Sequence, residues 1–131
     1  MDVLLDASVI MAIILNEPNR TKVIHQTENA ALLSSEAISF EIGNALINLF
    51  KMKKINEENL IEAYRSYTLI PMKTIKADIE KASKIACKYK IYAYDAYYLE
   101  IAYRLKLPLI TFDASMKRVG LDLKISIMGN E

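Results

Sequence analysis

The chain has 131 residues, and its 17 Lys and Arg residues nearly balance its 16 Asp and Glu residues. A composition of 53% hydrophobic and 25% charged residues excludes a disordered chain or a repeat array and predicts one globular domain over residues 1–131. The near-neutral charge also excludes a polybasic tail. Because Cys87 is the only cysteine, no intrachain disulfide can form, which favours the cytoplasm, and we expect Cys87 in the core.

The apolar N-terminal segment does not have the form of a signal peptide, because Asp2 and Asp6 interrupt it and no Lys or Arg precedes the apolar run at 9–15. That run is too short to span a bilayer. The single histidine, His25, excludes a zinc site built from several histidines, and we expect it on a helix, either at the surface or half-buried. Any chemistry in this chain is therefore expected to depend on carboxylates.

The first half of the chain alternates between short apolar runs and longer periodic segments. Asp6 ends the first apolar run, Pro18 follows the next helical segment, and Ser34 and Ser35 are suitable residues to begin a helix. The expected elements are a strand at 3–5, helices at 8–15 and 19–27, a strand at 31–33 and a helix at 36–53.

The second half continues this alternation. Asn56 is a good helix cap followed by two acids, Pro71 weakens the next strand, and apolar residues at helical spacing indicate two further helices. The expected elements are a helix at 56–67, a strand at 69–75, helices at 76–89 and 93–106, a strand at 109–112, a short helix at 115–118 and an edge strand at 123–128. Strands interleaved with helices predict an α/β fold with a parallel sheet.

Acidic residues follow two of these strands and lie within two of the helices. Asp6 and Asp113 are at the carboxyl ends of strands, where open α/β sheets bind ligands. Asp95 lies in the first turn of a helix among apolar and aromatic residues, and Glu41 shares a helix face with Asn44 beside an apolar stripe. Taken singly, the two strand-end acids are also consistent with helix caps, Asp95 with a helix-dipole partner and Glu41 with a solvated surface.

A parallel sheet gathers strand ends and helix starts along one edge, so we expect the four acids to lie together there. Two carboxylates about 4 Å apart repel each other by roughly 4 kcal/mol at an effective dielectric of about 20. Protonation or a hard divalent cation relieves this repulsion, and Mg²⁺ or Mn²⁺ suits a site without His or Cys. Such a metal orients water and stabilises charge on a phosphoryl oxygen, which makes phosphodiester hydrolysis the natural reaction class.

Four segments resemble, in this order along the chain, the motifs of PIN-domain ribonucleases: DASVI at 6–10, SFEIGNAL at 39–46, YDAYYLEIA at 94–102 and TFD at 111–113. The resemblance covers nearly the whole chain, whose size and element order are similar to those of VapC toxins of VapBC toxin–antitoxin modules. It implies a catalytic and metal-binding quartet of Asp6, Glu41, Asp95 and Asp113. It also implies supporting polar roles for Ser8, Asn44 and Thr111.

The same resemblance implies a three-layer α/β/α fold with a five-stranded parallel sheet flanked by helices. The implied activity is that of a Mg²⁺-dependent endoribonuclease, with Mn²⁺ able to substitute, acting on RNA as the toxin of a type II toxin–antitoxin module. The implied assembly is a homodimer with a small antitoxin protein as partner, and no membrane association is expected. Two alternatives remain open: an RNA-binding or scaffold protein that keeps the fold without cutting, and a nuclease of RNA processing that is not a toxin.

Two side-chain types are concentrated between residues 73 and 103. Six lysines at 73–90, and three more at 51–54, could guide RNA toward the acids, although exposed lysines are also the ordinary surface of a helix. Six of the eight tyrosines lie at 89–103, where core or subunit contacts are the favoured explanation and base stacking is the alternative. Apolar residues at 10–15 are expected in the core, with any exposed members available to an antitoxin segment.

Two other enzyme classes with an acid after the first strand do not fit the pattern. A haloacid-dehalogenase-like phosphatase would need a second Asp at position 8, where this chain has Ser8. A phosphoacceptor receiver domain would need an Asp after the central strand, whereas the apolar segment at 69–75 is followed by Lys76.

Overall fold

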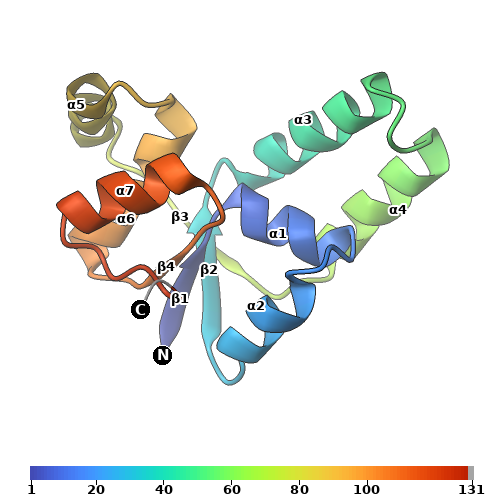
Figure 1. The fold of residues 1–131 in the computed structure, drawn as a ribbon, viewed down its shortest axis with the longest axis horizontal. Coiled ribbons are helices and arrows are strands. Elements are labelled where there is room, and N and C mark those ends of the chain that lie inside the picture. The colour runs from blue at the N-terminus through green and yellow to red at the C-terminus, as the bar shows by residue number, and fades with distance from the viewer. Residues whose placement is uncertain (130–131) are drawn as a thin grey trace.

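The computed structural model describes residues 1–129, in which parallel strands form a sheet with helices on both sides (Figure 1). The elements are β1 (Asp2–Leu5), α1 (Ala7–Ile14), α2 (Arg20–Gln26), β2 (Ala31–Ser35), α3 (Ile38–Lys51), α4 (Glu57–Thr68), β3 (Lys73–Ile75), α5 (Ile79–Tyr89), α6 (Ala93–Leu105), β4 (Leu109–Ile110) and α7 (Ala114–Asp122). Figure 1 shows α1 to α4 on one side of the sheet and α5 to α7 on the other. The predicted α/β class with a parallel sheet is confirmed.

The sheet has four strands within residues 1–129, in the order β3-β2-β1-β4, so the expectation of five strands is wrong. The segment expected as an edge strand at 123–128 makes a single parallel bridge, between Leu109 and Ile127. α7 continues to Asp122, and Lys124 has a left-handed backbone conformation with φ of 62°. Only a few extended residues therefore remain beside β4, too few to make a strand.

Three element boundaries differ from the prediction for identifiable reasons. β2 runs through Ser34 and Ser35, so these serines do not begin a helix, and β3 begins at Lys73, after Pro71, which cannot donate a ladder hydrogen bond. α7 passes through Gly120 instead of ending near it. A Cβ at this position would come within 2.7 Å of Ile127 Cδ1, so the glycine lets the C-terminal segment pack closely on the helix.

The buried core surrounds β1, which lies between β2 and β4 in the sheet. Val3, Leu4 and Leu5 are fully buried, as expected for a parallel strand with helices on both faces. The residue that follows them is Asp6, so the first acid of the sequence pattern comes directly after a buried segment of the sheet. α6 supplies a second buried surface that includes Tyr98.

An ion pair between a buried Glu and a partly exposed Arg joins α6 to the start of α5. Glu100 is 2% exposed, and Arg104 Nε donates to its Oε2 at 2.6 Å. The backbone N–H of Asp78 donates to Glu100 Oε1 at 2.7 Å, and Arg104 also donates to the carbonyl of Lys76 at 2.9 Å. Both carboxylate oxygens of Glu100 accept hydrogen bonds, which makes the pair a structural link between two helices.

Two predictions about single residues have opposite outcomes. Cys87 is exposed, so the expectation of a core cysteine is wrong: the inward face of α5 carries Ala82, and Cys87 lies on another side of the helix. His25 is exposed in the last turn of α2, as expected. Within residues 1–129, no helix combines the length and apolar character needed to cross a bilayer.

Candidate functional site at the carboxyl edge of the sheet

The register of the sheet places Asp6 beside Thr111. Leu5 of β1 pairs with Ile110 of β4, and the Asp6 N–H donates to the Ile110 carbonyl at 3.4 Å. The two residues that leave these strands are therefore neighbours at the carboxyl edge of the sheet. In Figure 1 this edge lies where α1 and α7 begin.

The Asp6 carboxylate is 4% exposed and is held by three donors. Ser8 Oγ donates to Asp6 Oδ1 at 2.7 Å, and the Val9 N–H donates to the same oxygen at 3.1 Å, which caps α1. The Thr111 hydroxyl donates to the other oxygen, Oδ2. Ser8 in turn accepts from the N–H of Phe112 at 3.1 Å, so its hydroxyl links the start of α1 to the end of β4.

Asp113 and Asp95 line one cavity next to Asp6. Asp113 caps α7, with Oδ1 accepting from the Met116 N–H at 2.7 Å, and Asp95 lies in the first turn of α6. The cavity measures about 370 Å³. Its walls are formed by Lys90, Ile91, Tyr92, Asp95, Asp113 and Ser115.

Glu41 approaches the same edge from the first turn of α3. The hydroxyl of Tyr98 on α6 donates to Glu41 Oε1 at 2.9 Å, and Tyr98 itself is 1% exposed. Glu41 is half-buried and hydrogen-bonded, so it is not the solvated surface residue that its position alone suggested.

The charges of the four acids act on one another. Burial raises the pKa of Asp6 above 3.8, hydrogen bonds from its donors oppose the rise, and the Asp113 charge adds to it. Burial raises the pKa of Asp95 to about 6, with further contributions from Asp113 and Asp6. Burial also raises the pKa of Glu41 to about 7; the Tyr98 hydrogen bond opposes this rise, and the charges of Asp6 and Asp95 increase it. Asp6, Glu41 and Asp95 are thus each near enough to another acid for its charge to disfavour their ionisation.

The structure brings most of the predicted site residues together at this edge. The four acids lie there, and Ser8 and Thr111 contact Asp6 directly. Asn44 lies on α3 one turn after Glu41 and is exposed. Asp6 and Asp113 cap the helices that follow them and also belong to the acidic cluster, so a helix-capping role does not exclude a role in the site.

Two residues of the site were not singled out from the sequence. Tyr98 was grouped with five other tyrosines, and Ser34 was expected to begin a helix, yet its hydroxyl donates to the Leu5 carbonyl at 2.8 Å beside Asp6. The available signal was the spacing of Tyr98 three residues after Asp95, which places both on one helix face. A buried tyrosine usually has a hydrogen-bond partner, so that spacing could have indicated a link to the acids.

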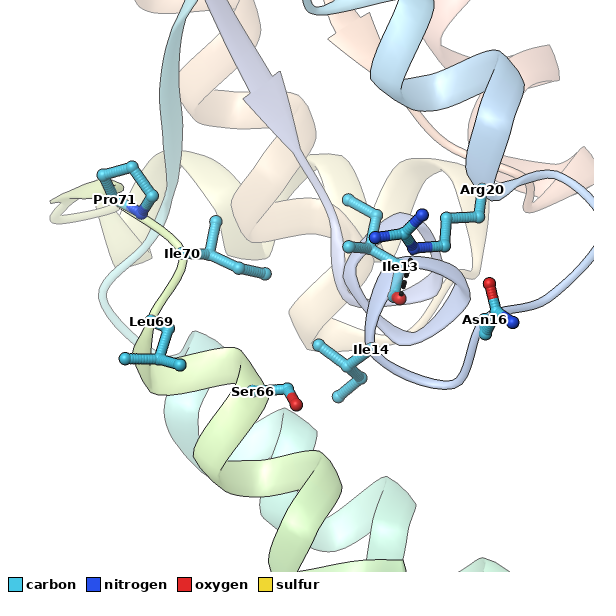
Figure 2. Close-up of a pocket in the computed structure, with 8 residues that line it drawn as sticks. All are labelled: Ile13, Ile14, Asn16, Arg20, Ser66, Leu69, Ile70 and Pro71. Carbon is cyan, nitrogen blue, oxygen red and sulfur yellow. Dashed lines mark hydrogen bonds between the residues drawn. The ribbon is translucent and has the colours of Figure 1, made fainter.

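A second cavity, of about 570 Å³, lies away from the acids, between α1, the start of α2 and the end of α4 (Figure 2). Its lining is mostly apolar and includes Ile13, Ile14, Leu69 and Ile70. Arg20 Nε donates to the Ile13 carbonyl at 3.2 Å, which fixes the α1–α2 corner on one side of the cavity. Leu69 is 81% exposed, so part of this apolar surface is open to solvent.

Comparison with known proteins places this architecture in a family. The chain superposes on PAE2754 from Pyrobaculum aerophilum with a TM-score of 0.68 at 22% identity, covering 95% of this chain and 98% of that chain. It superposes on VapC20 from Mycobacterium tuberculosis, described as a sarcin–ricin loop cleaving toxin, with a TM-score of 0.63 at 10% identity, covering 90% of this chain and 95% of that chain.

A further structural match is a toxin–antitoxin complex from Klebsiella pneumoniae, with a TM-score of 0.54 at 19% identity, covering 85% of this chain and 86% of that chain. No curated protein matches the sequence. The sequence model of the PIN domain matches residues 3–121, which is most of the chain. On this match, and with the fold that these structures share, the chain belongs to the PIN domain family.

Proposed function

We propose that this chain is a Mg²⁺-dependent endoribonuclease that hydrolyses RNA phosphodiester bonds, with Mn²⁺ able to replace Mg²⁺. The observation that carries the proposal is the acidic quartet, Asp6, Glu41, Asp95 and Asp113, at the carboxyl edge of the sheet, where burial and the charges of neighbouring acids raise the pKa values of Asp6, Glu41 and Asp95. Neighbouring ionised carboxylates repel each other in the protein alone, and a bound cation offsets that repulsion. An all-oxygen donor set suits a hard divalent ion.

The carboxylate oxygens of the quartet fit this cation. Hydrogen bonds occupy Oε1 of Glu41 and Oδ1 of Asp113, which leaves the second oxygen of each acid available. Burial and neighbouring charges, without a hydrogen bond, raise the pKa of Asp95. Across the described part of the chain, no three acidic, His or Cys side chains are close enough to bind one ion together. Mg²⁺ commonly takes one or two carboxylates and keeps several waters, so we expect the remaining acids to act through bound water.

Three of the four acids have roles that follow from their surroundings. A bound Mg²⁺ lowers the pKa of a water and stabilises charge on the phosphoryl oxygen. Asp6 keeps a fixed orientation because Ser8, Val9 and Thr111 hold both of its oxygens. Glu41 and Asp95 have raised pKa values in the metal-free protein, about 7 and about 6, and a cation would favour their ionised forms, so we expect both to hold it, directly or through water.

The cavity beside the quartet supports RNA as the substrate. Lys90 contributes a positive charge at its wall, which favours a polyanion. The ring of Tyr92 is 83% exposed and offers a face on which a base can stack. Asp95 and Asp113 line the same cavity, so a nucleotide held there places its phosphate next to the acids.

The proposed biological role is that of the toxin of a type II toxin–antitoxin module. Two similar structures are described as a toxin and a toxin–antitoxin complex. The apolar cavity in Figure 2 is suited to an apolar segment of an antitoxin, because Ile13, Ile14 and Leu69 present apolar groups there. Replacing Leu69 with Lys is expected to weaken antitoxin binding in a pull-down without changing RNA cleavage. The homodimer and the cytoplasmic location remain predictions, which light scattering and cell fractionation can test.

The test of the proposed activity is RNA cleavage by wild type and Asp6→Asn, purified identically, with Mg²⁺, with Mn²⁺ and with EDTA. Asn is also a good helix cap, so Asp6→Asn is expected to keep the start of α1. Asp2→Asn removes the same charge from an exposed residue of β1 and serves as the matched control. Metal-dependent cutting by wild type and Asp2→Asn, lost in Asp6→Asn, is the expected result.

The same experiment identifies the alternatives. Equal cutting by all three proteins would indicate a contaminating ribonuclease and contradict the proposal. RNA retained but not cut by wild type, with affinity unaffected by Asp6→Asn, would favour an RNA-binding protein with this fold.

A further inference from the structure

Tyr98 carries a hydroxyl group deep inside the protein. The residue is 1% exposed, and a Phe ring would fill almost the same space without burying a polar atom. A buried hydroxyl is costly unless it forms a hydrogen bond. Its acceptor is Glu41 Oε1 at 2.9 Å, so the oxygen of this tyrosine contacts the acidic quartet, whereas its ring belongs to the core.

A second hydroxyl group lies beside this hydrogen bond. Ser34 of β2 lies within hydrogen-bonding reach of the Tyr98 oxygen and donates its own hydrogen to the Leu5 carbonyl at 2.8 Å. An ionised carboxylate has only acceptor atoms, so the Tyr98 hydroxyl is the donor in its hydrogen bond to Glu41 Oε1. Leu5 immediately precedes Asp6, so these contacts connect the backbone beside one acid with the side chain of another.

Asp6 and Asp113 are held by hydrogen-bond donors other than Tyr98. Asp6 is held by three donors, and Asp113 by the N–H of Met116. Glu41 has a longer side chain, is half-buried, and can turn toward solvent unless a partner holds it. The Tyr98 hydroxyl supplies that partner and leaves Oε2 of Glu41 available.

We propose that Tyr98 is a positioning residue, which holds the Glu41 carboxylate in the orientation needed to bind the divalent cation. This inference rests on the proposed function. It assigns Tyr98 no contact with substrate or with the ion, because the hydroxyl acts through Glu41 alone.

The experiment compares wild type and Tyr98→Phe in Mn²⁺ titrations followed by the melting temperature, without RNA. Removing one oxygen while keeping the ring is expected to leave the metal-free melting temperature close to that of wild type. The Mn²⁺ concentration at the midpoint of stabilisation is expected to rise about tenfold, the usual size of effect when a partner that orients a metal ligand is lost. In cleavage assays, kcat is expected to fall while KM for RNA stays unchanged.

Two further variants separate positioning from a general structural effect. In a Glu41→Gln background, Tyr98→Phe is expected to cause no additional loss of Mn²⁺ binding, because the residue through which it acts has already been changed. Tyr103→Phe, on an exposed part of the same helix, is the matched control and is expected to behave like wild type.

The possible results distinguish this inference from the proposed function. A normal Mn²⁺ response of Tyr98→Phe, or an equal loss in the presence and absence of Glu41, would overturn the positioning role and leave the proposed function standing. A lower melting temperature with an unchanged Mn²⁺ midpoint would also overturn it. A wild-type protein without any Mn²⁺ response would overturn the proposed function and this inference together.

Discussion

Replacing Asp95 with Asn is expected to stabilise the metal-free protein at pH 8. Burial, Asp113 and Asp6 raise the pKa of Asp95 in the folded state to about 6, from an ordinary value of 3.8 that we take for the unfolded chain. The folded state therefore holds the proton more tightly. The stability from this group is fully present below about pH 4 and is lost as the pH rises through about 6. Asn does not ionise, so the variant does not suffer this loss.

The size of the effect follows from the difference between the two pKa values. A rise from 3.8 to about 6 corresponds to about 3 kcal/mol. Asp95 is partly open to solvent, and screening reduces the expected gain to about 1 kcal/mol. The unfolding entropy of a chain of this length is about 0.28 kcal/mol/K, so the melting temperature is expected to rise by about 4 °C.

The assay is thermal melting followed by circular dichroism, in EDTA, at pH 8 and pH 5. The gain at pH 5 is expected to be about half of that at pH 8, because part of the folded protein then has a protonated Asp95. Asp2→Asn, which changes an exposed residue, is expected to show no pH-dependent gain. A gain of equal size at both pH values, or none at pH 8, would refute the electrostatic reasoning.

Three further predictions concern the metal, the RNA and the fold. The affinity for Mn²⁺, measured by calorimetry, is expected to fall between pH 8 and pH 6, because protons compete for Glu41, whose pKa is about 7; a constant affinity would contradict this. Tyr92→Ala is expected to raise KM for RNA about tenfold with little change in kcat, and Tyr92→Phe to behave like wild type, whereas equal effects of both would argue against stacking. Arg104→Leu is expected to reduce the free energy of unfolding in urea by about 1.5 kcal/mol, because the buried carboxylate of Glu100 loses the hydrogen bonds of a partly exposed cation; no measurable loss would contradict this.

The position of the four acids could be predicted from the sequence because it depends on rules that act over short segments. Apolar runs ending in Asp6 and Asp113 indicated strands, and parallel strands bring their carboxyl ends to one edge. The first turns that carry Glu41 and Asp95 begin at the same edge, so the cluster required no knowledge of side-chain packing.

Features that depend on contacts between distant segments could not be predicted in this way. The bond from Tyr98 to Glu41 joins residues 57 positions apart, and nothing in the local pattern around either residue specifies the other. The missing fifth strand has a similar cause: residues 123–128 alternate like a strand, but the first two of them form the turn that follows α7. Cys87 was assigned to the core by residue type, whereas the helical spacing of its neighbours decides its exposure.

The measurement that tests the account most directly is the location of Mn²⁺ by anomalous scattering in crystals of the wild-type protein. The account predicts an ion within about 2.3 Å of at least one carboxylate of the quartet, with water completing its coordination, and no such ion in Asp6→Asn crystals. An ion bound elsewhere on the surface, or an unoccupied quartet at Mn²⁺ concentrations that support RNA cleavage, would contradict the claim that these four acids form the metal site.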